Sequence, residues 1–160
     1  MPAGPDIKMP MPPLSWTRLA TIRALSLEAW KLTPKQHLPW QHDEKAAFAQ
    51  ARAQGKGVMV DFAATWCTPC EEMELTFGDE EVFDTITASF VPLKLDVSEG
   101  DTDAMEKRGR YGAPTLPAVV FLDTGGSVLG RVKNLIEPDA MLEVVRPAAR
   151  RLKSNESARN

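Results

Sequence analysis

The chain has 160 residues, 43% of them hydrophobic, which is enough for one packed core and too few for two ordinary domains. Its net charge of -3, with both signs mixed along the chain, lacks the basic surface that nucleic-acid binding needs, so we expect no nucleic-acid partner. Its two cysteines can build neither a disulfide framework nor a four-cysteine zinc site.

Residues 1–42 are expected to form an extension outside the globular domain. The prolines within residues 1–13 exclude a helix there and predict an extended linker. Residues 15–32 fit a helix with an apolar stripe, which would pack either on the domain or on a membrane surface. No apolar run is long enough to cross a bilayer, and no secretory signal is evident. We therefore expect either a cytoplasmic protein or a piece whose targeting or anchoring segment precedes Met1.

The globular domain is expected to span residues 43–152 and to alternate helices with strands. Apolar periodicity and capping residues predict helices over residues 44–54, 67–75, 79–89 and 101–110, and a closing helix from residue 138. Strands are predicted over residues 58–63, 91–97, 117–123 and 127–132, the last two forming a hairpin. This order predicts an α/β domain with a central mixed β-sheet flanked by helices. Residues 153–160 are expected to be a flexible tail.

Cys67 and Cys70 follow the apolar strand at residues 58–63 and open the next helix. Because free N–H groups and the dipole of a helix N-terminus stabilise a thiolate, Cys67 is expected to be the exposed nucleophile. Cys70, one turn further on, would attack the mixed disulfide and release the reduced substrate. Pro69 suits the first helical turn, where its missing N–H costs nothing. Alone, such a pair also fits half of a zinc site or two unrelated thiols, and its place between strand and helix favours redox chemistry.

Two segments together resemble the thioredoxin superfamily. Residues 60–70, which include Val-Asp-Phe and Thr-Trp-Cys-Thr-Pro-Cys, resemble its active-site strand and loop, and residues 110–118 resemble its second active-site segment. The resemblance covers residues 43–152 and implies the thioredoxin fold. Residues 70–82 further resemble the C-terminal thioredoxin-like domain of the DsbD family of thiol:disulfide interchange proteins.

The resemblance implies substrate-binding roles for Trp66, Leu116 and Pro117. Pro117 matches the cis-proline of the family, so the bond from Leu116 to Pro117 should be cis and lie across from Cys67. The Leu116 backbone would then be free to pair with an extended substrate. Trp66 is expected to shield the thiols and shape the docking surface. The alternative for Pro117 is an ordinary trans proline that opens a strand.

Asp61 is a carboxylate in the middle of an apolar strand, a costly position unless the group is protonated or paired. The resemblance places it beneath Cys70, where an acid with a raised pKa could take up the Cys70 proton. Lys94 matches the lysine that approaches this acid. Glu74, one helical turn after Cys70, matches an acidic residue that tunes the site in DsbD-like domains. The alternatives are a strand-edge Asp61 and a solvated Lys94 side chain.

These features predict a thiol–disulfide oxidoreductase that reduces protein disulfides with Cys67 and Cys70 as its redox group and with no other cofactor. No metal is expected, because His37 and His42 lack ligand partners at metal-site spacing.

We expect a monomer in the periplasm or another extracytoplasmic compartment, tethered to a membrane in the full-length protein or free. Its partners would be protein disulfide substrates and an upstream thiol donor, either soluble or membrane-embedded. Three other interpretations stay open: a reductant for cytochrome c maturation, a non-catalytic binding module, and a dimer bridged by zinc through the cysteines.

Overall fold

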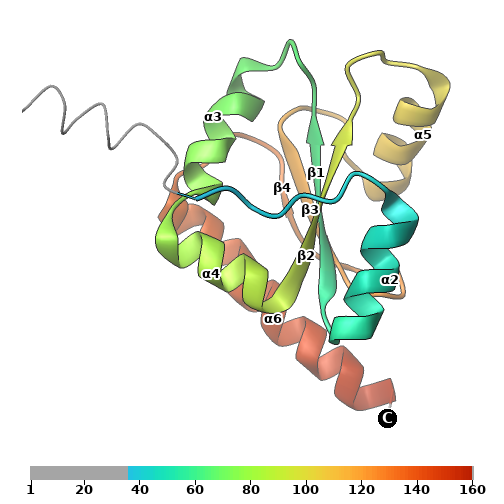
Figure 1. The fold of residues 1–160 in the computed structure, drawn as a ribbon, viewed down its shortest axis with the longest axis vertical. Coiled ribbons are helices and arrows are strands. Elements are labelled where there is room, and N and C mark those ends of the chain that lie inside the picture. The colour runs from blue at the N-terminus through green and yellow to red at the C-terminus, as the bar shows by residue number, and fades with distance from the viewer. Residues whose placement is uncertain (1–35, 160) are drawn as a thin grey trace, which may run out of the picture. The chain divides into compact units, whose positions relative to one another are not determined.

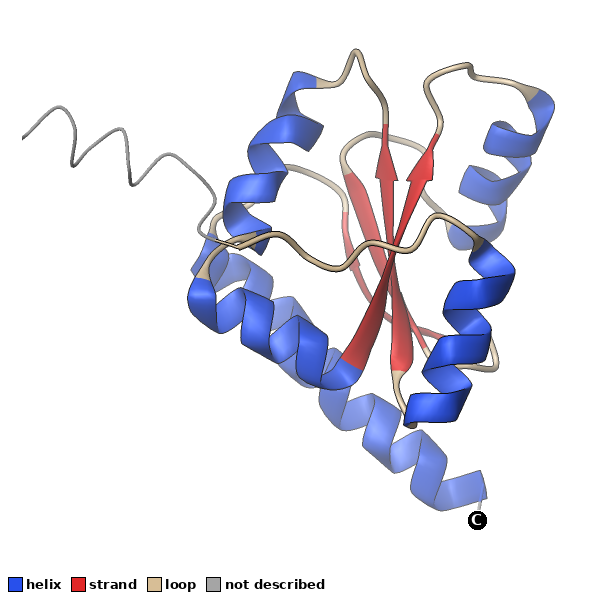
Figure 2. Cartoon of the chain, viewed as in Figure 1, coloured by secondary structure: helices blue, strands red, loops and turns tan. Residues whose placement is uncertain are grey.

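The computed structural model describes residues 36–159, which form a mixed four-stranded sheet between two layers of helices (Figures 1 and 2). The elements in chain order are α2 (Glu44–Gln54), β1 (Gly57–Ala63), α3 (Thr68–Phe77), α4 (Glu80–Ser89), β2 (Phe90–Asp96), α5 (Thr102–Tyr111), β3 (Ala118–Leu122), β4 (Val128–Val132) and α6 (Pro138–Arg159). The strand order is β2-β1-β3-β4, and only β1 and β2 of these strands run parallel to each other. The predicted mixed sheet flanked by helices is confirmed.

Strand β1 lies inside the sheet and buries side chains on both faces. Val58, Val60 and Phe62 belong to the core layer that α2 and α5 cover. Met59 belongs to the opposite layer, which α3, α4 and α6 cover. Figure 1 shows α2 and α5 on one side of the sheet and α3 and α4 on the other. Since side chains alternate along a strand, Asp61 points to the same side as Met59, toward the layer that contains α3.

Aspartates begin three of the described helices, as the sequence predicts. Asp43, Asp79 and Asp101 accept backbone N–H groups in the first turns of α2, α4 and α5. A glycine is needed where β1 begins, because a side chain at Gly57 would collide with the carbonyl oxygen of Leu122. The aspartate caps and Gly57 therefore fix where these helices and β1 begin.

The domain begins before residue 43, where the sequence analysis placed its boundary. Leu38 is buried in the layer beneath α3, α4 and α6, and Trp40 packs against that layer. Gln41 joins the outer edge of β2 through a parallel bridge to Leu93. Burial of these apolar side chains and the added backbone pairing hold residues 38–41 on the domain, despite the nearby prolines. Residues 1–35 of the expected extension, including the helix expected over residues 15–32, lie outside the described residues.

Within residues 36–159, no helix is both long enough and apolar enough to cross a bilayer.

Helix α6 continues to Arg159, so the expectation of a flexible tail after Leu152 is wrong. The reason is Asp123, a buried carboxylate just after β3. It accepts hydrogen bonds from Asn155 Nδ2 at 3.2 Å and from Arg159 Nη2 at 3.0 Å. These contacts with a residue distant in sequence secure the last turns of α6 to the β3–β4 hairpin.

Hydrogen bonds also control the ionisation of Asp123. Burial alone would raise the pKa of this carboxyl, but the backbone N–H groups of Ser127 and Gly125, the Asn155 amide and the Arg159 charge together hold the pKa below its usual 3.8. A carboxyl whose pKa is lowered by folding stabilises the folded state above its unfolded-state pKa. That contribution is lost as the pH falls through the folded-state value.

Replacing Asp123 with alanine is therefore expected to lower the free energy of unfolding at pH 7 by about 2–4 kcal/mol, because four hydrogen-bond donors lose the charged acceptor that they share. Urea unfolding followed by circular dichroism would measure the change, which should shrink as the pH is lowered below 3.8. Asp84 is exposed on α4. Its alanine variant is the control and should change stability by less than about 0.5 kcal/mol. Equal effects of the two substitutions would contradict this role of Asp123.

Candidate active site

Cys67 and Cys70 lie where the chain leaves β1 and enters α3. Cys67 is the N-cap residue of α3, Cys70 lies in its first turn, and a disulfide joins them with their Cα atoms 5.3 Å apart. The backbone N–H of Cys70 donates to the Cys67 carbonyl oxygen at 3.1 Å. Pro69 occupies the first turn, as predicted. A thiolate at Cys67 would therefore lie at the positive end of the helix dipole.

The two cysteines do not differ in exposure, so the expectation that Cys67 is the exposed one is wrong for the disulfide form. Cys67 is 5% exposed and Cys70 is 6% exposed. The disulfide keeps both within the core layer that α2 and α5 cover. A difference in reactivity must therefore come from their positions on α3, and only Cys67 occupies the cap position.

Trp66 is 65% exposed and stands next to the disulfide. Its indole Nε1 donates to the carbonyl oxygen of Ser98 at 3.1 Å, and the Thr65 N–H donates to the Ser98 hydroxyl at 2.8 Å. Asp96 at the end of β2 in turn accepts from the Ser98 N–H at 2.9 Å. Ser98 therefore orients the cysteine loop, a role that the sequence analysis missed. The signal in the sequence is an Asp-x-Ser turn directly after a strand parallel to β1.

Leu116 and Pro117 lie beside the same loop. Strand β3 begins at Ala118, which pairs with Phe62 near the end of β1, so the residues before Ala118 lie next to the connection that carries the cysteines. The bond between Leu116 and Pro117 is cis, which confirms that expectation. The substrate-binding roles of Trp66, Leu116 and Pro117 stay predictions.

Arg108 on α5 anchors the loop that leads to Pro117 by hydrogen bonds. Its Nε donates to the carbonyl oxygen of Ala113 at 3.1 Å, and its Nη2 donates to that of Pro114 at 2.5 Å. Nothing in the local sequence pattern distinguishes Arg108 from the other basic residues of α5, so its role is not predictable from the sequence.

Asp61, Lys94 and Glu74 meet on the side of the sheet that α3 covers. Asp61 and Lys94 are register partners on β1 and β2, and Lys94 Nζ lies 3.8 Å from Asp61 Oδ2. The same ammonium group donates to Glu74 Oε1 on α3. Asp61 is 2% exposed, so it is not a strand-edge carboxylate. The structure thus brings the three predicted acid and tuning residues together, with one lysine shared by two carboxylates.

Burial raises the pKa of Asp61 from 3.8 to about 7. The positive charge of Lys94 opposes this rise, and the negative charge of Glu74 adds to it. An acid that titrates near neutral pH can both accept and return a proton under the conditions in which thiols exchange. Glu74, a member of this cluster, lies one helical turn after Cys70 on α3.

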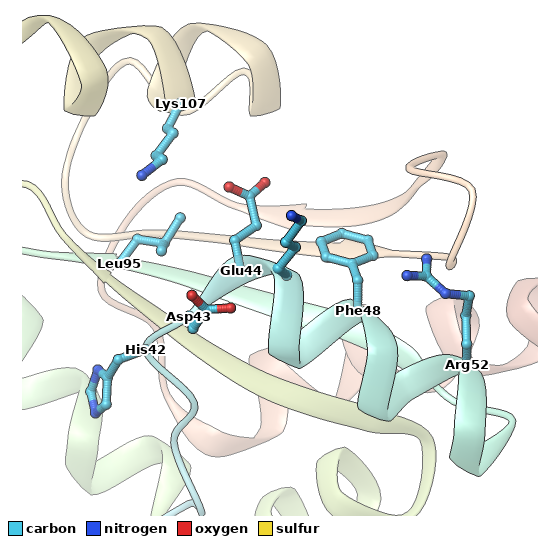
Figure 3. A pocket seen from close by; sticks show the side chains of 8 residues that line it. His42, Asp43, Glu44, Phe48, Arg52, Leu95 and Lys107 are labelled. Carbon is cyan, nitrogen blue, oxygen red and sulfur yellow. The ribbon is translucent and has the colours of Figure 1, made fainter.

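A hollow of about 490 Å³ lies over α2 and beside α5, apart from the cysteine pair (Figure 3). The residues that line it are His42, Asp43, Glu44, Lys45, Phe48, Arg52, Leu95 and Lys107. Its charged side chains are of both signs and none is fully buried, so no single ligand charge is selected. Within residues 36–159, no three His, Cys, Asp or Glu side chains gather closely enough to hold a metal ion.

The family described as Thioredoxin-like matches residues 39–124, which contain both cysteines, Asp61 and Pro117. The thiol:disulfide interchange protein DsbD of Pseudomonas fluorescens is 36% identical over 84 residues, which are 52% of this chain and 14% of that protein. The chain thus spans only a small part of the length of such curated relatives.

The fold is shared with solved structures of known proteins. A thioredoxin from Thermus thermophilus is 28% identical with a TM-score of 0.59, covering 69% of this chain and 86% of that one. The oxidised C-terminal domain of DsbD from Neisseria meningitidis is 22% identical with a TM-score of 0.57, covering 68% of this chain and 95% of that one.

In the reduced protein at neutral pH, a short pulse of iodoacetamide is expected to modify Cys67 before Cys70. The N-terminus of α3 stabilises a thiolate at its cap position, and thiols at helix N-termini ionise more readily than free ones, so a rate difference of roughly tenfold is expected. Mass mapping of the labelled peptides measures the order. The single variants Cys70→Ala and Cys67→Ala, each with one thiol, provide the matched controls. Equal labelling, or faster labelling of Cys70, would reverse the assigned roles.

Replacing Asp61 with asparagine is expected to make stability less dependent on pH. Because the folded-state pKa of about 7 lies above the value of 3.8 for a solvated aspartate, the folded parent binds more protons between these pH values. The free energy of unfolding of the parent therefore falls as the pH rises through that window. Asparagine cannot ionise. The free energy of unfolding of the variant, relative to that of the parent, should therefore rise by about 2–4 kcal/mol from pH 4 to pH 8.

Urea unfolding of the oxidised proteins at both pH values tests this prediction, with Asp84→Asn as the exposed control. A stability difference between Asp61→Asn and the parent that stays constant from pH 4 to pH 8 would show that Asp61 has an ordinary pKa.

Proposed function

Because this chain belongs to the thioredoxin-like family, we propose that it reduces disulfide bonds in other proteins through Cys67 and Cys70. The observation that carries the proposal is the placement of the cysteine disulfide at the N-terminus of α3, directly after the strand that buries Asp61. The helix N-terminus favours the attacking thiolate, and the buried acid supplies a proton acceptor that works near neutral pH.

The exchange proceeds in two balanced steps. The Cys67 thiolate attacks one sulfur of a substrate disulfide, forms a mixed disulfide and releases the first substrate thiolate. Cys70 then gives its proton to the Asp61 carboxylate and attacks the Cys67 sulfur, which closes the Cys67–Cys70 disulfide and releases the second substrate thiolate. Two electrons pass from the cysteine pair to the substrate, and no further cofactor is required. An upstream dithiol restores the pair by the same steps in reverse.

The charges around the site favour a reductant over an oxidant. A strong disulfide oxidant stabilises its reduced form by stabilising the thiolate heavily. Here the residues between the cysteines are Thr68 and Pro69, neither of which carries a charge. Asp61 and Glu74 share one lysine, so the cluster carries a net negative charge when both acids are ionised and disfavours a further anion nearby.

The partners we propose are protein disulfide substrates and an upstream thiol donor, by analogy with the thiol:disulfide interchange proteins that the chain resembles. A reductase that acts on disulfides is needed where disulfides form, which supports an extracytoplasmic compartment. The exposed indole of Trp66 and the loop that ends at Pro117 supply the docking surface for such a substrate.

The reduction potential tests the proposed direction. Equilibration in dithiothreitol or glutathione buffers, read by an alkylation gel shift, should give a value nearer about -270 mV than about -120 mV. The protein should also reduce insulin when dithiothreitol regenerates it, and the Cys70→Ser variant should instead accumulate the mixed disulfide. A potential on the oxidising side of about -180 mV would mean that the protein forms disulfides. Stoichiometric zinc in the purified protein, without insulin reduction, would favour the zinc-bridged dimer.

A further inference from the structure

The segment before α2 places an aromatic ring beside the acid cluster. The Gln41 N–H donates to the carbonyl oxygen of Pro92 at 2.8 Å, and the Lys94 N–H donates to the carbonyl oxygen of Gln41 at 2.9 Å. These two bonds add the segment to the edge of β2 at the level of Lys94. This register fixes the position of the neighbouring residue, Trp40, along β2.

Trp40 contacts two elements of the site. Lys94 Nζ lies 4.4 Å from the centroid of the indole ring, within the range of a cation–π interaction. On α3, the ring of Phe77 lies edge to face with the indole, with centroids 5.5 Å apart. The ring therefore packs on the helix that carries Cys70 and Glu74 while it covers the ammonium group that both acids share.

We propose that Trp40 is a positioning residue of the redox site, whose indole ring holds the Lys94 ammonium group between Asp61 and Glu74. The proposal deepens the proposed function, because Asp61 is the proton acceptor of that reaction. It also makes the segment before α2 part of the redox site. Nothing in the proposal requires Trp40 to touch substrate or either sulfur.

The direction of the effect follows from the charges that face Asp61. On the described elements packed around it, these are Lys94 from β2 and Glu74 from α3. The Lys94 side chain is 23% exposed, so without the ring its ammonium group can turn toward solvent. Asp61 would then keep the repulsion of Glu74 and lose part of the attraction of Lys94, and its titration midpoint would rise.

The experiment is a carbon-13 NMR titration of the Asp61 carboxyl group in the full chain with the disulfide formed, so that no thiol titrates in the same range. Trp40→Leu should raise the midpoint by roughly 0.3–1 pH unit. Trp40→Phe keeps a π face and should shift it by less than half as much. In the parent, the Lys94 ε-methylene protons should be shifted upfield by the ring current of the indole, which needs no variant to observe.

Two controls separate positioning from a general loss of packing. Leu38→Ala removes a buried side chain from the same segment without touching Lys94, so it should lower stability and leave the midpoint unchanged. Lys94→Met should raise the midpoint, and adding Trp40→Leu to it should cause no further rise, because the ring acts only through the lysine.

An unchanged or lowered midpoint in Trp40→Leu would overturn the proposal, as would an equal rise in the Lys94→Met background or Lys94 protons without the upfield shift. The titration uses no substrate and no turnover. A failed insulin assay would therefore refute the proposed function without bearing on the role of Trp40, and a failed titration would leave the proposed function standing.

Discussion

Asp61 is an ionisable acid buried in an inner strand of the sheet, where removing its charged form from water costs free energy. A rise in pKa from 3.8 to about 7 corresponds to about 4 kcal/mol at neutral pH, a large share of the roughly 5–15 kcal/mol that stabilises a typical domain. Lys94 reduces the penalty by approaching to 3.8 Å, and Glu74 holds Lys94 from the other side. A side chain kept at such expense in the core is expected to serve chemistry rather than folding.

The sheet topology brings the remaining groups to one place. The parallel pairing of β1 with β2 makes Asp61 and Lys94 register partners, and the end of β1 leads into the cysteine loop. Antiparallel β3 starts beside that end, so the loop through Pro117 arrives at the same edge of the sheet. Ser98, after the end of β2, then anchors the cysteine loop. Most of these groups therefore follow or precede strand ends at a single edge, where loops are free to vary while the sheet stays fixed.

Local patterns predicted most of this arrangement. The apolar run of β1, the aspartate caps and the spacing of the cysteines each carry their own signal, and the resemblance added the cis bond and the pairing of Asp61 with Lys94. What failed depended on contacts between distant residues. Residues 1–42 were expected to lie outside the domain, yet Leu38 is buried in the core. Asp123 extends α6 where a tail was expected after Leu152. Cys67 is only 5% exposed in the disulfide form, and periodicity does not reveal this burial.

Sharing one lysine between two acids couples proton transfer to the charge of the site. With Asp61 ionised, the cluster of Asp61, Glu74 and Lys94 carries one net negative charge, and with Asp61 protonated it is neutral. A thiolate that forms at Cys70 is therefore opposed while Asp61 is charged, and this opposition is relieved when the proton of Cys70 moves to Asp61. Proton movement and sulfur attack are thereby favoured together. The same coupling raises the free energy of the dithiolate state, which makes the pair a better donor of electrons than a site with unopposed positive charge.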